Sequence, residues 1–285
     1  WDISQSTTVP TGEGFTTSQK LDCTTADSSL DAGNLLLWRQ KIEGKNLQHL
    51  KYGTSSAESL TLSFWVRSAK TGTYIVELNN ENSGGAKKQS QSYTISSADT
   101  WEKKTITFAG DTATAFENTA NGELLVYFWL AAGSTYTGGG SLNTSWNSGV
   151  ANNTRAYGQV NLADSTSNDW YITGVQLEIG DNATPFEHLP FQDNSMLCYR
   201  YYYEMTNQHD VMYGMNYNGN TANRGFVTYS LPVPMNHTPT TTQTIGGGSH
   251  QANYHTLERL AFYIATTNGD ANSGWVDYFT AEAEI

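Results

Sequence analysis

The glutamates are the first residues to test for chemistry, because 27 acidic residues outnumber 15 Lys and Arg residues. A glycoside hydrolase needs two carboxyl groups facing each other across a cleft, one as the acid and one as the base or nucleophile. Several glutamates fall in predicted strands or beside turns, but no spacing pairs them with another acid in this way. They are Glu77, Glu102, Glu123, Glu178 and Glu187. We predict structural or solvent-exposed roles for them and no catalytic residue.

The other catalytic and metal-binding patterns are absent from the sequence. There is no G-x-S-x-G nucleophile motif, and the six histidines form no H-x-x-x-H or H-E-x-x-H set. Glycine triplets at 138–140 and 246–248 lack the following helix and the Lys-Ser/Thr pair of a phosphate-binding loop. We therefore predict no enzyme activity, no metal and no cofactor.

Sugar binding needs less specialised residues, and residues 132–158 contain them. A pyranose stacks its apolar face on Trp or Tyr, and its hydroxyl groups need polar partners such as Asn and Arg. The predicted carbohydrate-binding residues are Tyr136, Asn143, Trp146, Arg155 and Tyr157. The stretch is also the longest predicted loop of its domain, and long ordered loops are often functional. The alternative is a structural flap in which Trp146 covers one end of the fold.

A second set of aromatic and polar residues lies near the C-terminus, in residues 207–226 and 246–255. Its members alternate with small residues, and loops of this kind suit contact with a receptor. The predicted receptor contacts are His209, Tyr213, Tyr217, Arg224, His250 and Tyr254.

The elements that position these residues are strands almost throughout. In residues 59–68, Leu62, Phe64 and Val66 point one way while Trp65 and Arg67 point the other, a period of two. Similar stretches follow at intervals of roughly 10 to 25 residues, separated by Gly, Asn, Asp and Ser turns. Residues 123–130 are apolar on both faces, which indicates a central strand covered on both sides. The sequence predicts an all-β fold, an antiparallel jelly-roll sandwich.

Two domains are expected from the length of 285 residues and from a proline-marked connector. The first domain is predicted over 1–184, and the connector over 185–198 holds Pro185 and Pro190, which cannot donate to a strand ladder. A short helix in the connector is predicted with Asp193 or Asn194 as its N-cap. A smaller β-sandwich-like domain is predicted over 199–285, beginning with a strand at residue 199.

The tyrosines and cysteines near this connector allow two interpretations each. The cluster at 199–203 is expected to pack the domain junction or a threefold interface, and a binding site is the alternative. Cys23 and Cys198 are expected to be buried free thiols, and a disulfide between them is the alternative.

Composition excludes two classes of partner. The net charge of −12 repels phosphate backbones and anionic lipid, so we expect no nucleic acid. No apolar run approaches the roughly 20 residues that span a bilayer, so we expect no membrane insertion. Many Thr, Ser, Asn and Gly residues with few charges are typical of an extracellular β protein.

Four stretches in a fixed order, at 41–78, 92–111, 142–146 and 170–205, resemble the jelly-roll domain of phage tail fibres and other virion proteins, especially in phages of aquatic bacteria. The domain is also similar in outline to carbohydrate-binding modules of families 4 and 9, which share a penultimate V-x-L-E strand. Those modules often hold a calcium ion through an Asp before that Val, where this chain has Thr173 and Gly174. The resemblance also places a strand before Trp1, so we expect a fragment of a longer protein.

The resemblance implies a non-enzymatic virion appendage on the phage surface, outside the cell. Its implied partners are a bacterial surface polysaccharide or receptor and other virion proteins, and its implied state is a homotrimer. The alternatives are a purely structural decoration protein, a glycan-degrading fibre enzyme, and an accessory carbohydrate-binding module of a secreted bacterial enzyme.

Overall fold

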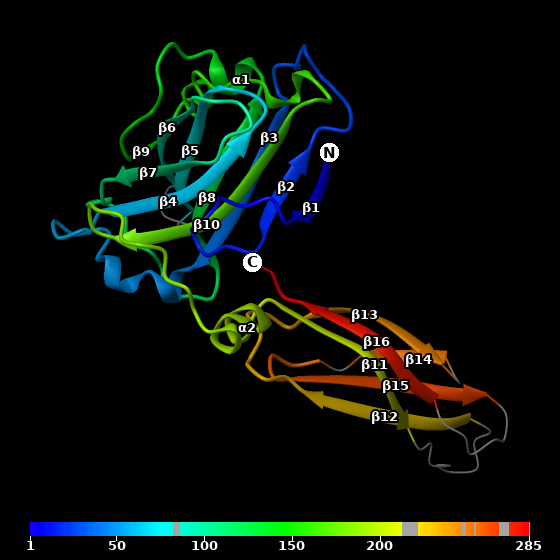
Figure 1. Ribbon diagram of the computed structural model, residues 1–285. Coiled ribbons are helices and arrows are strands. Elements are labelled where there is room, and N and C mark those ends of the chain that lie inside the picture. The colour runs from blue at the N-terminus through cyan, green and yellow to red at the C-terminus, as the bar shows by residue number, and fades with distance from the viewer. Residues whose placement is uncertain (82–85, 213–221, 247–248, 254, 268–273, 285) are drawn as a thin grey trace. The chain divides into compact units, whose positions relative to one another are not determined.

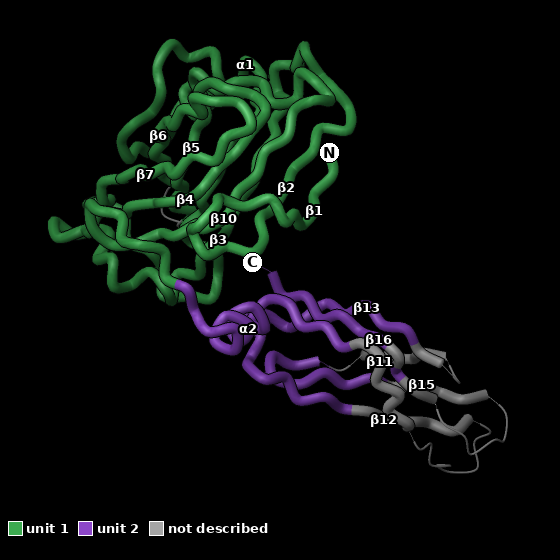
Figure 2. Tube along the Cα trace, viewed as in Figure 1, with its two compact units in different colours: residues 1–187 green, residues 188–285 purple. Residues whose placement is uncertain are grey.

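The chain divides into two compact units, Trp1–Glu187 and His188–Ile285 (Figure 2). The computed structural model describes residues 1–81, 86–212, 222–246, 249–253, 255–267 and 274–284. Within these ranges, side chains are not described at 206–227, 245–253, 263–267, 274–275 and 277.

Unit 1 consists of two five-stranded antiparallel sheets (Figure 1). The first sheet has the order β1 (Asp2–Ser6), β2 (Ser18–Asp22), β10 (Asp169–Ile179), β4 (Leu60–Ser68), β7 (Glu102–Phe108). The second has the order β3 (Leu35–Glu43), β8 (Gly122–Ala132), β5 (Gly72–Asn80), β6 (Lys87–Ile95), β9 (Asn147–Ser148). The sheets pack face to face, which confirms the predicted jelly-roll sandwich.

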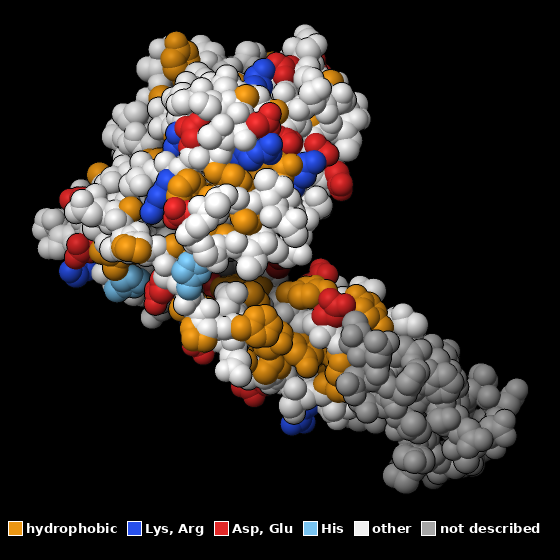
Figure 3. Space-filling view, in the orientation of Figure 1, with side chains coloured by type: hydrophobic (Ala, Val, Ile, Leu, Met, Phe, Trp, Pro, Cys, Tyr) orange, Lys and Arg blue, Asp and Glu red, His pale blue; other side chains and the backbone are white. Residues whose placement is uncertain are grey.

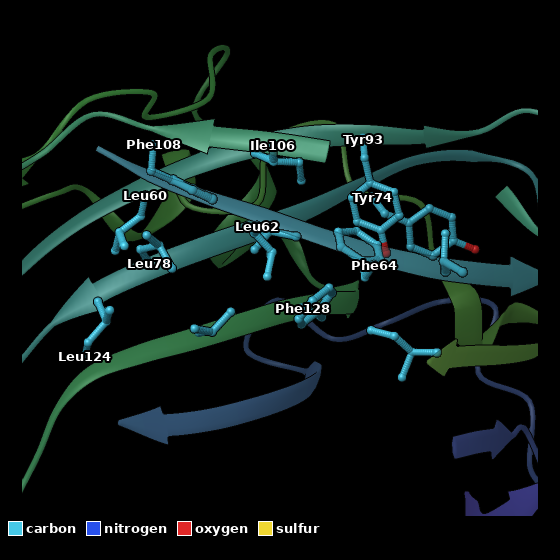
Figure 4. Packing of buried hydrophobic residues seen from close by; sticks show 14 of the residues in the cluster. Leu60, Leu62, Phe64, Tyr74, Leu78, Tyr93, Ile106, Phe108, Leu124 and Phe128 are labelled. Atoms are coloured by element: carbon cyan, nitrogen blue, oxygen red, sulfur yellow. The ribbon is translucent and has the colours of Figure 1, made fainter. Parts of the chain in front are cut away.

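The core of unit 1 lies between the two sheets, and strand alternation determines which side chains enter it. Phe64 of β4 and Phe128 of β8 are fully buried, and their ring centroids lie 5.1 Å apart in an edge-to-face contact. Figure 4 shows these rings among leucines and tyrosines from both sheets. On β8 the neighbouring Trp129 points to the opposite side and is also fully buried, as the apolar residues on both faces predicted.

The end of unit 1 folds back along β10. Gly174 lies at the bulge between Thr173 and Gln176 with a φ of +59°, and the Phe15 ring occupies the space where a Cβ would stand. Phe15 also meets Phe186 edge to face at 5.1 Å. The Gln176 side chain accepts a hydrogen bond from the backbone N–H of Glu187 (2.8 Å). The chain therefore leaves unit 1 along a fixed path.

Unit 2 is a smaller sandwich of two three-stranded antiparallel sheets. One has the order β11 (Tyr202–Met212), β16 (Gly274–Glu282), β13 (Thr240–Gly246), and the other β12 (Ala222–Ser230), β15 (Arg259–Thr267), β14 (Ser249–Asn253). Phe262 and Phe279 are fully buried between them, 5.3 Å apart. This arrangement confirms the predicted smaller β domain.

Helix α2 (Phe191–Tyr199) corrects three predictions about the connector. It begins at Phe191 with Pro190 as the N-cap, so Asp193 and Asn194 both lie inside the helix and neither is its N-cap. Tyr199 ends the helix rather than starting a strand. Cys198, expected to be buried, is an exposed free thiol because α2 buries none of its residues, whereas Cys23 is buried and free as expected.

Candidate functional site

The predicted sugar-binding loop lies over the outer side of the second sheet of unit 1. It starts with α1 (Ser134–Thr137) and continues through β9 and short 3-10 turns at 152–154 and 162–164. Trp129, Ile75 and Leu125 project from this side of the sheet, and Ala156 of the loop is buried against them. The loop is thus a cover that completes a second hydrophobic cluster.

Arg155 fastens this cover to the sheet. Its Nε and one terminal nitrogen donate to the two carboxylate oxygens of Glu77 at 2.9 and 2.6 Å, and Glu77 is fully buried. The guanidinium also lies over the Trp129 ring at 5.2 Å. Burial raises the pKa of Glu77, although the Arg155 hydrogen bonds oppose that shift. The two charges are buried together. If the guanidinium turned toward a ligand, it would leave the Glu77 carboxylate buried without its cation, so its hydrogen bonds stabilise the fold instead.

Asn143, Tyr136 and Trp146 also contact the protein itself. Asn143 donates to the Lys88 carbonyl (2.8 Å), and the Tyr136 ring packs on Trp129 at 5.3 Å. The Trp146 indole donates to the Ala109 carbonyl (2.5 Å), and the ring packs against the main core. This is the covering role that the sequence allowed as the alternative.

Tyr157 differs from the other predicted loop residues, because 40% of its surface is exposed. Sugar contact by these five residues stays a prediction. The structure brings the Arg155 guanidinium to 5.9 Å from the centre of the Tyr136 ring, but the hydrogen bonds of that guanidinium go to Glu77.

The predicted receptor contacts lie outside the part of the chain whose side chains are described. The backbone at three of them belongs to strands: His209 to β11, Arg224 to β12 and His250 to β14. Tyr213, Tyr217 and Tyr254 fall among residues that the structure does not describe.

A different surface of unit 1 gathers aromatic and charged side chains: the outer side of the first sheet. The register sets Tyr171 of β10 beside Arg67 of β4, and Trp65 of β4 beside Lys103 of β7. Trp101, just before β7, meets the Tyr171 ring at 6.2 Å. We call these five residues the aromatic face.

The charged groups around Tyr171 are held in place by one another. The Arg67 guanidinium lies 4.8 Å from the centre of the Tyr171 ring and donates to the Asp99 carboxylate at 2.7 Å. Lys20 approaches the same ring at 5.8 Å and pairs with Asp22 at 2.9 Å. The Asp22 hydrogen bond raises the pKa of Lys20. Cations over an aromatic ring are attracted to its face, so this arrangement is preorganised.

The aromatic face also has groups that a ligand can reach. Trp65 and Trp101 are partly exposed, and Lys103 is exposed. The Trp101 indole nitrogen, by contrast, is itself buried and has no hydrogen-bond partner within the described residues. Figure 3 shows hydrophobic side chains between Lys/Arg and Asp/Glu side chains on this side of unit 1. A ring that is open on one side, with charged groups beside it, suits stacking of a sugar with hydrogen bonds at its rim.

A hollow of about 430 Å³ lies at the β1 edge of the first sheet, lined by residues 3–5, 17–19 and 172–173. Thr173 belongs to its lining and is the cross-strand neighbour of Trp65. Most of the other lining side chains carry hydroxyl or amide groups. Thr173 is thus the point at which the hollow meets the aromatic face.

Sequence reasoning placed Trp65 and Arg67 on the side opposite the core but did not identify them as a site. The alternation of β4 gave their side of the sheet, but single aromatic or charged residues on the solvent side of a strand are common and do not by themselves mark a site. Tyr171 and Trp101 were harder to find, since only the pairing of distant strands brings them to Arg67.

Four of the five carboxylates tested for catalysis make internal contacts. Glu102 accepts hydrogen bonds from the backbone N–H groups of Ser96 and Ser97 at 2.8 and 2.9 Å, and Glu178 accepts one from Thr184 at 3.1 Å. The backbone N–H of Glu117 donates to the buried Glu123. Across the described ranges, no group of three His, Cys, Asp or Glu residues is placed to hold a metal ion. Nor does any described helix have the length and apolarity to cross a membrane.

Comparison with known proteins identifies no family. No family model matches the chain, and no curated protein matches it. Among solved structures, it is similar to the enzymatically active domain of tailspike protein 4 of bacteriophage CBA120, with 13% identity and a TM-score of 0.34 over 62% of this chain and 18% of that chain. A CBM4 structure shares 11% identity, with a TM-score of 0.31 over 57% of this chain and 70% of that chain.

A CBM22 tandem domain from Paenibacillus barcinonensis is a third similar structure, with 10% identity and a TM-score of 0.31 over 100% of this chain and 84% of that chain. With TM-scores below 0.5, these likenesses carry no argument about function. The functional proposal rests on the residues of this chain.

Proposed function

We propose that the chain is a non-enzymatic glycan-recognising protein of a phage virion appendage, and that unit 1 binds sugar at the aromatic face. The observation that carries this proposal is the set of partly exposed indole rings on one sheet face, with fixed charged groups beside them. Trp65 supplies the stacking platform, and Lys103 and Arg67 stand beside it.

The aromatic face favours binding because little has to be ordered when a ligand arrives. Trp65 is held on a central strand of the sheet, between strands β10 and β7. A ring on a strand is positioned more accurately than one on a loop, and an aromatic side chain has few rotatable bonds to immobilise. Stacking a sugar on the open face of a large aromatic ring removes apolar area of both partners from water, which favours the binding of a small number of sugars.

The non-enzymatic part of the proposal is supported by the engagement of the candidate acids. Glu77 is paired with Arg155, and Glu102 accepts two backbone hydrogen bonds. Hydrolysis of a glycosidic bond, with inversion or retention at the anomeric carbon, requires a second carboxyl group across an open cleft. These carboxylates hold strands and turns instead.

The virion location rests on the sequence motifs at 41–78, 92–111, 142–146 and 170–205, whose order resembles phage tail-fibre domains. In that setting the ligand is a polysaccharide of the bacterial surface, and the remaining partners are other virion proteins. Association into a homotrimer belongs to the same proposal.

Binding to an array of bacterial surface polysaccharides tests the proposal. Trp65→Ala removes the platform, and Tyr157→Ala is the matched control because it removes an exposed aromatic ring from the loop predicted from sequence. We expect the wild type and Tyr157→Ala to bind the same polysaccharides, and Trp65→Ala to lose at least tenfold in affinity. If only Tyr157→Ala lost binding, the sugar would bind at the loop over residues 132–158 and not at the aromatic face. No binding by the wild type would favour a structural decoration protein.

A further inference from the structure

Two of the cations on the aromatic-face side of the first sheet are paired with acids of the same surface. Lys20 pairs with Asp22 at 2.9 Å, and Arg67 pairs with Asp99 at 2.7 Å. A third acid, Asp169, lies 3.8 Å from the other terminal nitrogen of Arg67. Three carboxylates therefore surround two cations on this side of the sheet.

The strand register brings these acids together at one end of the sheet. Asp22 of β2 is the cross-strand neighbour of Asp169 of β10. Arg67 of β4, on the next strand, reaches to the turn before β7, where it donates to both the side chain and the backbone carbonyl of Asp99 at 2.7 and 3.0 Å. We call Asp22, Asp99 and Asp169 the acidic rim.

In the two close pairs, the acid is more exposed than the cation. The side-chain exposure is 41% for Asp22 against 25% for Lys20, and 58% for Asp99 against 18% for Arg67. A ligand that approaches this surface from solvent therefore meets the carboxylates before the paired cations. Lys103 is exposed as well, but it supplies a single positive charge against these two carboxylates.

A sugar that carries a carboxylate or phosphate group is disfavoured at such a surface. Like charges brought together at an interface act against the wrong ligand. If Arg67 turned toward an acidic sugar, it would give up its hydrogen bonds with Asp99. The net charge of −12 adds a repulsion of the same sign at longer range.

An uncharged sugar meets none of this repulsion. Its hydroxyl groups are donors, and an ionised carboxylate is an acceptor of strong hydrogen bonds. Asp22 and Asp99 can therefore accept from the hydroxyl groups of a sugar that stacks on a neighbouring ring. The exposed acids thus favour one class of polysaccharide and disfavour the other.

We infer that the acidic rim makes the aromatic face selective for uncharged polysaccharides over those with carboxylate or phosphate groups. This inference rests on the proposed function, because it names the ligand class of the same site. Asp99 is the main determinant of selectivity, since it is the most exposed acid of the rim and it neutralises Arg67.

Binding of the full chain to one polysaccharide in two chemical forms tests the inference. The probes are a neutral polysaccharide that the wild type binds on the array and the same polysaccharide after part of its primary hydroxyl groups has been oxidised to carboxylates. We expect the wild type to prefer the neutral form by about tenfold in about 20 mM salt, where charges are weakly screened. Binding to acidic polysaccharides alone on the array would overturn the inference.

The variant Asp99→Asn removes one charge of the acidic rim. Asn tolerates the φ of +56° at this position as Asp does. The preference for the neutral form should fall by about threefold in about 20 mM salt, and the difference from the wild type should vanish in about 0.5 M salt. The matched control is Glu58→Gln, which removes an exposed acid of unit 1 that pairs with Lys51. It should keep the wild-type preference.

The outcomes separate this inference from the proposed function. A wild type that binds both forms equally, or an Asp99→Asn variant with the wild-type preference, would overturn the inference and leave the sugar site standing. An equal fall in Glu58→Gln would attribute the effect to the net charge of the chain and would overturn the role of the acidic rim. A wild type that binds no polysaccharide would refute the proposed function, and the inference with it.

Discussion

Replacing Arg155 with Ala should destabilise unit 1 severely, because it leaves Glu77 buried without its cation. The two residues form a two-point ion pair, and Glu77 is fully buried. Removing one partner of a buried pair typically costs about 3–5 kcal/mol. That is a large part of the roughly 5–15 kcal/mol by which a domain is stable. The loop over the second sheet should loosen at the same time, because Arg155 packs on Trp129.

The loss should also depend on pH. Burial already raises the pKa of Glu77 in the folded protein, and without Arg155 nothing comparable opposes that shift. A carboxyl group whose folded pKa lies above its unfolded value holds its proton better in the folded state, so its contribution to stability falls as the pH rises through that interval. The deficit of Arg155→Ala relative to the wild type should therefore be larger at pH 8 than at pH 5.

Urea unfolding followed by tryptophan fluorescence measures this effect in unit 1, since seven of the eight Trp residues lie there. The control is Glu58→Gln, which breaks the exposed pair between Lys51 and Glu58 and should cost no more than about 1 kcal/mol. The double variant Glu77→Gln, Arg155→Met should recover most of the lost stability. A cost below about 1 kcal/mol for Arg155→Ala, equal to that of the control, would refute the reasoning.

Two further substitutions test the packing of unit 1. Gly174→Ala should lower the free energy of unfolding by about 1–3 kcal/mol, because the new Cβ would stand 2.5 Å from the Phe15 ring at a φ of +59°. The control is Gly149→Ala, at a φ of +67° with open space around it, which should cost at least about 1 kcal/mol less by urea unfolding. Equal costs would show that the Phe15 ring moves aside without a penalty. Phe128→Ala should lower the free energy of unfolding by about 3–5 kcal/mol, because the ring is fully buried between the sheets, and a cost under 1 kcal/mol would contradict that placement.

The fold was predictable from sequence because strand alternation and burial follow the same period. Residues such as Phe64 and Phe128 indicate the core directly, because every second side chain of a strand points to the same face of its sheet, and here that face is the buried one. The start of α2 was not predictable in the same way. Pro190 has no polar side chain to act as a cap, so the capping rule pointed instead to Asp193.

The candidate site was only partly predictable. A loop rich in Trp, Tyr, Asn and Arg has the composition of a sugar site, but composition does not reveal which side chains are used internally. Arg155 is committed to Glu77, a residue 78 positions away, and no local pattern predicts that pairing. The aromatic face depends likewise on the register between β10 and β4, which brings Tyr171 to Arg67.

Hydrogen-exchange mass spectrometry of the full chain, with and without a polysaccharide that it binds, tests the central claim most directly. The account predicts slower exchange in 61–68, 99–105 and 169–176 when the polysaccharide is bound, with 133–158 unchanged. Protection confined to 133–158, or absent from all of unit 1, would contradict sugar binding at the aromatic face.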